Sequence, residues 1–368
     1  MPSVRALLSL LALLGLGALV GSATSPDGTG TPAALQASGE SSSSEGLAVL
    51  RDGRVRGMTL STPTWGWEWG TEAMDSSLRE LAGLGVSWVA IHPYGGIRED
   101  GSVRLRPIDP AAPPDWLARP IREAHALGMQ VMIKPHIAYW GTRWDWRGAI
   151  AFETEAQRAR FWADYSAFIV TLAEASAGAD AFVVGTELDR LLADEAEWRA
   201  LIGKVRAVYD GPITYAANWT DYQRVPFWDA LDVIGVQAYF PLMQRAPGGV
   251  PTDRELDAGW DAALAPVVAL AERLEKPVVF TELGYNRSDR APVEPWAYAT
   301  GGDHAEAIQA ACVRAAIRAM DRHEAVLGGF FWKWFPGPAT PRDFDASAPY
   351  LRDILADTWG RPLATLRP

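Results

Sequence analysis

Two glutamates stand where the sequence predicts the carboxyl ends of buried strands. The apolar run VVGTE ends at Glu187 and the run VVFTE ends at Glu282, at positions where a core strand would continue with Val or Ile. One such glutamate could simply begin a solvated loop. Two of them, each preceded by threonine, favour a pair of carboxyl groups that act together. Such a pair suits hydrolysis of a glycosidic bond, in which a protonated acid releases the leaving oxygen and an ionised carboxylate acts as nucleophile or base. The two groups then need different environments, so that one carboxyl group keeps its proton and the other stays charged.

Other strand ends supply groups that suit a sugar. We expect the Tyr239 hydroxyl to donate a hydrogen bond to Glu282, the Asn218 amide to hold a sugar hydroxyl, and the Trp219 indole to stack on a ring. The chain has 17 tryptophans, and several follow predicted strands, in surface loops where a core role is hard to assign. Strict alternation predicts that Trp332 and Trp334 share one face of the last strand. The candidate substrate-binding residues are Trp65, Trp67, Tyr94, Lys134, His136, Trp140, Asn218, Trp219, Tyr239, Tyr285 and Trp332.

Composition argues against other classes of function. A net charge of −11 disfavours a nucleic-acid partner, because such binding depends on Lys and Arg neutralising phosphates. Five histidines and one cysteine leave little for a metal site, and only His92 and His136 lie on neighbouring predicted strands. No Gly-x-Ser-x-Gly run marks a serine hydrolase. We expect no cofactor and no metal.

The elements that must position the two glutamates alternate between strand and helix. The predicted strands are Arg54–Ser61, Val86–Pro93, Gln130–Ile137, Ala181–Leu188, Ile213–Trp219, Val233–Phe240, Pro277–Gly284 and Gly328–Phe335. The predicted helices are Glu72–Leu84, Pro114–Leu127, Glu155–Ala177, Glu195–Tyr209, Glu255–Leu274, Ala305–His323 and Tyr350–Thr358, with at most a short helix between the fifth and sixth strands. Eight such repeats predict an α/β fold of the (β/α)8 TIM-barrel type in a single domain, over 49–368, rather than a two-domain doubly wound arrangement. In this barrel the active site lies at the carboxyl ends of the strands.

The first 48 residues are predicted to lie outside the barrel. Residues 1–23 have Arg5, an apolar run and then small residues, which is typical of a secretory signal peptide, with an uncleaved anchor as the alternative. Residues 24–48 are rich in Ser, Gly, Thr and Pro and are predicted to be a flexible linker. We therefore expect a secreted or extracytoplasmic monomer with no stable membrane insertion after cleavage.

The layout resembles clan A of the glycoside hydrolases, and within it glycoside hydrolase family 113, the β-mannanase-like family. The resemblance rests on RGMT at 56–59, VSWVA at 86–90, KPH at 134–136, VGTEL at 184–188 and FTELGY at 280–285. It implies a retaining mechanism with Glu187 as acid/base, Glu282 as nucleophile and Tyr239 steadying the nucleophile, the two carboxyl groups lying about 5–5.5 Å apart. One position departs from the clan: Thr186 stands where many members have an asparagine that contacts the sugar 2-hydroxyl. Asn218 is a candidate to replace it.

The favoured hypothesis is an endo-acting β-mannanase-like hydrolase of β-linked polysaccharide or oligosaccharide. The alternatives are a β-glucan-active hydrolase (an endoglucanase or β-glucosidase), a sugar-binding barrel without catalysis, and a metal-dependent amidohydrolase. The two glutamates disfavour the binding protein, and the few histidines disfavour the amidohydrolase.

Overall fold

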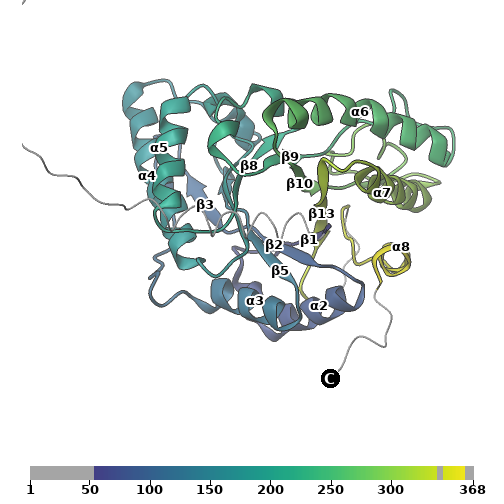
Figure 1. Cartoon of the computed structure of the whole chain (residues 1–368), viewed down its shortest axis with the longest axis horizontal. Coiled ribbons are helices and arrows are strands. Elements are labelled where there is room, and N and C mark those ends of the chain that lie inside the picture. The colour runs from purple at the N-terminus through teal and green to yellow at the C-terminus, as the bar shows by residue number, and fades with distance from the viewer. Residues whose placement is uncertain (1–53, 338–342, 361–368) are drawn as a thin grey trace, which may run out of the picture. The chain divides into compact units, whose positions relative to one another are not determined.

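In the computed structural model, which describes residues 54–337 and 343–360, eight parallel strands close into a barrel (Figure 1). The barrel strands are β1 (Val55–Leu60), β2 (Trp88–Ile91), β5 (Gln130–Ile133), β7 (Ala181–Thr186), β8 (Ile213–Asn218), β9 (Ile234–Gln237), β10 (Val278–Leu283) and β13 (Val326–Trp334). They neighbour one another in chain order, and β13 closes the ring by pairing with β1. The predicted TIM barrel is thereby confirmed. The predicted signal peptide (1–23) and linker (24–48) lie outside the described residues.

Helices cover the outside of the strands, as Figure 1 shows. They are α2 (Glu72–Gly83), α3 (Asp115–Ala126), α4 (Glu155–Ala175), α5 (Glu195–Arg206), α6 (Asp253–Leu274), α7 (Ala305–Arg322) and α8 (Pro349–Trp359). The two longest, α4 and α6, begin at capping boxes in which Thr154 and Thr252 accept a backbone N–H from the third helical residue. Between β8 and β9 there are only the 3-10 turns η4 (Tyr222–Arg224) and η5 (Trp228–Ala230), in line with the short connection expected there. None of the helices in the described ranges is long and apolar enough to cross a lipid bilayer.

The barrel interior is filled with side chains rather than open. One buried cluster contains residues that lie on each barrel strand or directly beside it, among them Val55, Trp88, Met132, Val183 and Phe330. A larger cluster lies between the strands and the helices. Because the interior is packed, the polar side chains at the carboxyl ends of the strands cannot enter it and instead face the mouth of the barrel.

Two strand ends differ from the predictions. The third strand stops at Ile133, and His136 instead begins β6 (His136–Ala138), which joins β3 (Tyr94–Ile97) and β4 (Val103–Arg104) in a small separate sheet over the mouth. On the last strand, Thr59 pairs with Trp332 but the next residue, Leu60, pairs with Trp334, so β13 carries one extra residue between them. Because this bulge interrupts the alternation, the prediction that Trp332 and Trp334 share a face is wrong.

Candidate active site

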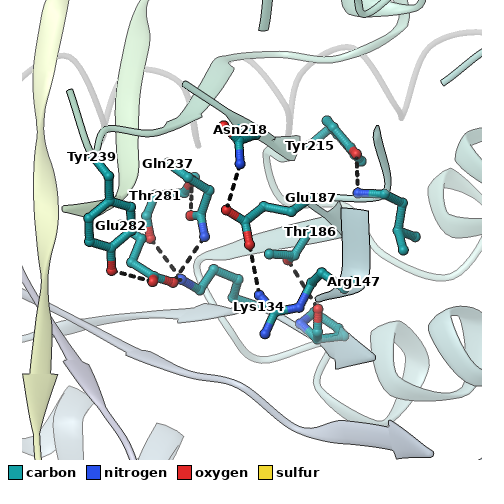
Figure 2. Close-up of polar contacts among 12 residues, drawn as sticks. Lys134, Arg147, Thr186, Glu187, Tyr215, Asn218, Gln237, Tyr239, Thr281 and Glu282 are labelled. Carbon is teal, nitrogen blue, oxygen red and sulfur yellow. Dashed lines mark hydrogen bonds and ion pairs between the residues drawn. The ribbon is translucent and has the colours of Figure 1, made fainter. Parts of the chain in front are cut away.

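Glu187 and Glu282 line the same cleft at the carboxyl end of the barrel. The cleft has a volume of about 530 Å³. Figure 2 shows both carboxyl groups extending from their strands into a shared space, each held by its own set of polar partners. The lining residues are Tyr139, Asp145, Trp146, Arg147, Glu187, Asn218, Trp219, Thr220, Tyr239, Glu282, Trp296, Tyr298, Trp332 and Phe344. Acidic groups surrounded by aromatic rings are what a sugar-cleaving cleft requires.

The backbone at Glu187 is held in an unusual conformation directly after β7. Its φ of 49° lies in the left-handed region, which costs a residue with a side chain about 1–2 kcal/mol. Neighbouring contacts hold it there: the Glu187 N–H donates to the Ala216 carbonyl at 2.9 Å, and the Leu188 N–H donates to the Tyr215 hydroxyl at 2.7 Å. Strain maintained in this way is common where a side chain must be aimed at a ligand. Here it ends the strand and turns Glu187 into the cleft.

The Glu187 carboxylate has two partners. Arg147, at the start of η2 (Arg147–Ala149), donates from Nη1 to Oε2 at 3.0 Å, and Asn218 Nδ2 lies 3.4 Å from Oε1. Burial raises the pKa of Glu187 and the negative charge of Glu282 adds to the rise, while Arg147 opposes it; the net pKa is raised. Glu187 is therefore the carboxyl group that tends to keep its proton.

The Glu282 carboxylate is more tightly held and has the opposite bias. Tyr239 donates its hydroxyl to Oε1, and Oε2 accepts from Lys134 Nζ and from Gln237 Nε2, the latter at 3.0 Å. Thr281 donates to Gln237 Oε1 at 3.0 Å, which turns the amide so that its NH2 group faces the carboxylate. Burial alone would raise the pKa of Glu282, but the Lys134 charge and the hydrogen bonds outweigh it, and the pKa is lowered. Glu282 is the carboxyl group that stays ionised.

The structure separates the predicted substrate-binding residues into groups. Asn218, Trp219, Tyr239 and Trp332 line the cleft. Lys134 and His136 are 0% and 1% exposed, because they lie beneath the cleft floor, where Lys134 supports Glu282 instead of meeting substrate.

Of the remaining predicted residues, Trp65, Tyr94 and Trp140 line a second hollow, and Trp67 packs against Arg106 on its rim. Tyr285 is 4% exposed and belongs to the core between strands and helices. The prediction that Tyr285 meets substrate is therefore wrong, because the chain turns inward once β10 has ended at Leu283.

Thr186, which departs from the clan pattern, does not face the cleft. It is 2% exposed and donates its hydroxyl to the Pro135 carbonyl at 3.1 Å (Figure 2). Asn218 is the amide beside the acid/base candidate instead, and its orientation is fixed because the Thr220 N–H donates to Asn218 Oδ1 at 3.0 Å.

The sequence analysis misses several residues that line the cleft or support its glutamates. Arg147 begins the short 3-10 helix η2, 40 positions before Glu187, and nothing in the neighbouring sequence indicates its role. Gln237 left a readable signal, since it is a polar residue that ends the buried strand IGVQ. Trp296 and Tyr298 come from the long segment after β10, and Trp296 stacks on Trp219 with ring centroids 5.4 Å apart.

The two histidines beneath the cleft do not form a metal site. His92 and His136 stack with ring centroids 4.9 Å apart, and burial lowers the pKa of both, so they are neutral. Across residues 54–337 and 343–360, no group of three or more His, Cys, Asp or Glu side chains is arranged to hold a metal ion.

Comparison with known families supports what the geometry indicates. The model of Glycoside Hydrolase Family 113 matches residues 58–346, which include both glutamates, seven of the eight barrel strands in full and β1 from Met58 onward. The chain belongs to Glycoside Hydrolase Family 113. It is thus a glycoside hydrolase of the β-mannanase-like type. A search of curated proteins finds no match.

Solved structures agree with the family. The chain is similar to the family 113 β-mannanase of Alicyclobacillus acidocaldarius in complex with ManMIm, with 28% sequence identity, a TM-score of 0.72, and coverage of 83% of this chain and 97% of that one. A family 113 β-1,4-mannanase shares 21% identity with a TM-score of 0.71 over 83% of this chain and 99% of that one. A β-glucuronidase of Ruminococcus gnavus shares the fold at 12% identity, with a TM-score of 0.55 over 83% of this chain and 50% of that one.

Proposed function

We propose that this family 113 hydrolase cleaves β-mannan chains with retention of anomeric configuration, using Glu187 as acid/base and Glu282 as nucleophile. The observation that carries the proposal is the opposite bias of two carboxyl groups in one cleft, since the pKa of Glu187 is raised and that of Glu282 is lowered. The similarity to β-mannanases is the reason for choosing mannan over other β-linked glycans.

In the first step Glu187 donates its proton to the glycosidic oxygen while the Glu282 carboxylate attacks the anomeric carbon. The bond from that carbon to the leaving oxygen breaks, and an ester to Glu282 forms. Lys134, Gln237 and Tyr239 keep the Glu282 carboxylate charged and fixed in place before the attack.

In the second step the ionised Glu187 takes a proton from water, and the water oxygen attacks the anomeric carbon and releases Glu282. Arg147 is placed to stabilise Glu187 in this charged state, because its guanidinium lies 3.0 Å from Oε2. Burial favours the protonated acid and Arg147 favours the carboxylate, so Glu187 can serve in both protonation states.

Around the glutamates, aromatic faces supply binding to sugar rings. Trp332 and Tyr239 belong to one small buried cluster at the cleft, with Trp219 packed against it. Flat indole rings suit the C–H faces of pyranose sugars, and the stacked pair formed by Trp219 and Trp296 adds such a surface to the cleft wall.

A substrate panel tests the proposal. Release of reducing ends from linear mannan, glucomannan and cellulose is measured for the unaltered protein and for Glu187→Gln, Glu282→Gln and the control Glu272→Gln, which removes one charge from the exposed face of α6. We expect turnover of mannan, losses of several orders of magnitude in the first two variants, and an unchanged control. If only cellulose is cleaved, cellulose and not mannan is the substrate. Near-normal activity of Glu187→Gln or Glu282→Gln would show that this glutamate has no part in the mechanism.

We further propose that the chain is exported and that cleavage follows Ala23, on the strength of the N-terminal sequence alone. Mass spectrometry of the protein recovered from a secreting host tests this. A mature N-terminus at Thr24 is expected, and an intact Met1 in the recovered protein would contradict it.

A further inference from the structure

A second hollow lies beside the catalytic cleft, under the β3–β4 hairpin. It has a volume of about 380 Å³. Its walls combine two kinds of side chain, aromatic rings and arginines, which are Trp65, Tyr94, Trp140, Arg98, Arg104 and Arg106. The proposed mechanism uses none of these residues.

The charge of this hollow is opposite to that of the protein. The chain has a net charge of −11, yet the hollow is lined by three arginines and by no Asp or Glu. Within the described part of the chain, none of the three guanidinium groups has an ion pair or a hydrogen bond to another side chain. The nearby acids of the hairpin have other partners: Asp100 pairs with Arg160 at 2.9 Å, and Glu99 accepts the Arg143 N–H at 2.8 Å. The Arg98 charge also lowers the pKa of Asp100, so the hollow is positive overall rather than lined by three uncompensated charges.

The aromatic residues place these charges beside surfaces that fit sugars. The central carbon of the Arg106 guanidinium lies 3.4 Å from the centroid of the Trp67 ring, a cation–π contact that restrains the side chain. Trp65 and Trp140 are 42% and 57% exposed, and their rings meet edge to face at 5.6 Å. An exposed indole next to a restrained guanidinium can hold a sugar ring and an acidic substituent on that ring at the same time.

A row of packed rings joins the wall of this hollow to the wall of the cleft beneath the surface, through the fully buried His92. Trp332 lines the cleft and lies 5.2 Å from His92, which lies 5.2 Å from Tyr94, which in turn lies 5.0 Å from Trp140 in the hollow. Residues 138–140 line both spaces, because Tyr139 faces the cleft while its two neighbours face the hollow. A glycan in the cleft can therefore reach the hollow with a sugar or branch only a short distance away.

We propose that the second hollow binds a uronic acid of the glycan, with its carboxylate on Arg98, Arg104 and Arg106 and its ring against Trp65 and Trp140. The hydrolase then prefers β-linked chains that carry an acidic sugar over neutral chains of equal size. The inference rests on the proposed function, because it assumes that the main chain of the glycan lies in the catalytic cleft. A planar carboxylate matches the guanidinium fork, and the adjoining indole faces accept the sugar ring that carries it.

The test compares two manno-oligosaccharides that differ only in charge. One carries a single glucuronosyl branch, and the other is the same compound after reduction of its carboxyl group to a neutral glucosyl branch. Binding is measured by calorimetry on Glu187→Gln protein, which slows turnover, and kcat/KM is measured on protein with Glu187 intact. Two further variants are used in both backgrounds: the double variant Arg98→Gln, Arg104→Gln, and the control Arg254→Gln, which removes a charge from exposed α6.

We expect the acidic compound to bind about twofold to fivefold more tightly than its reduced partner at low salt, a ratio in the range of exposed charge pairs. The ratio should fall towards one in the double variant and in 0.5 M NaCl, and should persist in Arg254→Gln. A ratio of one in otherwise unaltered protein overturns the inference, and so does a ratio that the double variant leaves unchanged.

The two proposals fail in different ways. If linear mannan is cleaved but the acidic and reduced compounds bind equally, the proposed uronic acid site is refuted and the proposed function stands. If no mannan is cleaved, the proposed function is refuted. The ratio of the affinities for the acidic and the reduced compound still decides whether the hollow selects a carboxylate.

Discussion

Replacing Lys134 by Met should destabilise the protein most at neutral pH and move the acid side of its activity profile. Lys134 is 0% exposed, and its Nζ donates both to Glu282 and, at 3.1 Å, to the Thr281 carbonyl. Met fills much of the same space without a charge or a donor. The variant therefore leaves a carboxylate that is 6% exposed with only the neutral donors Gln237 and Tyr239.

The magnitude follows from the burial of both partners. Removing one partner of a buried ion pair costs about 3–5 kcal/mol of unfolding free energy, because the remaining charge is uncompensated. Since Lys134 is a main cause of the lowered pKa of Glu282, its loss raises that pKa. The carboxyl group of the variant then takes up a proton at a higher pH. A group with a lowered pKa in the folded state contributes stability above its unfolded pKa and loses it as the pH falls through the folded value. The deficit of the variant should accordingly shrink towards pH 4.

The assay is urea unfolding followed by tryptophan fluorescence at pH 7 and pH 4.5, together with kcat/KM on mannan as a function of pH. Lys276→Met is the matched control, because Lys276 Nζ also donates to a carbonyl, that of Leu231 at 2.5 Å. Among the described residues it forms no ion pair, although its charge lowers the pKa of the exposed Asp229. The control should show a small loss of stability at both pH values and an unshifted activity profile. An equal loss at both pH values in Lys134→Met, with the acid limb in place, would refute the assignment of Lys134 as the support of an ionised Glu282.

Three further outcomes are expected. Tyr239→Phe removes one donor to Glu282 but keeps the ring, so kcat/KM on mannan should fall about tenfold to a hundredfold and the acid limb should move to higher pH; a profile identical to that of the unaltered protein would contradict this. Arg147→Ala removes the charge that opposes the raised pKa of Glu187, so the basic limb should move to higher pH while kcat falls, and a basic limb that moves to lower pH would reverse the assignment. Gly85→Ala places a Cβ 1.8 Å from the Trp359 carbonyl at a φ of 86°, so thermal melting should occur at a lower temperature, by several degrees, with the pH profile unchanged; an unaltered melting temperature would show that α8 is not held against this turn.

The barrel and its two glutamates could be predicted because both leave local marks in the sequence. Each strand is a short apolar run between turns, and a glutamate that interrupts such a run is conspicuous. Parallel strands bring their carboxyl ends to one side of the barrel, so the pattern alone placed Glu187 and Glu282 at the same opening. The structure puts both in one cleft.

The rest depends on backbone geometry that the pattern does not encode. Trp332 and Trp334 face different ways because of one extra residue in β13, and bulges of this kind leave no sign in the alternation. Tyr285 follows the nucleophile candidate by only three positions, yet it turns into the core because the strand has already ended. Arg147 reaches Glu187 from the one-turn helix η2 in the connection between β6 and α4, where sequence spacing says nothing about distance in space. The contact between Lys134 and Glu282 cannot be predicted from spacing either, because Glu282 lies on a strand that is distant in sequence.

The most direct measurement of the central claim is mass spectrometry of the protein after reaction with a 2-deoxy-2-fluoro-β-mannosyl fluoride, which slows breakdown of a covalent intermediate. If Glu282 is the nucleophile and Glu187 the acid/base, the protein gains the mass of one fluorosugar, and peptide mapping places the label on Glu282. A label on Glu187 would reverse the two roles. An unlabelled protein that cleaves mannan with inversion would show that Glu282 forms no covalent bond to the sugar.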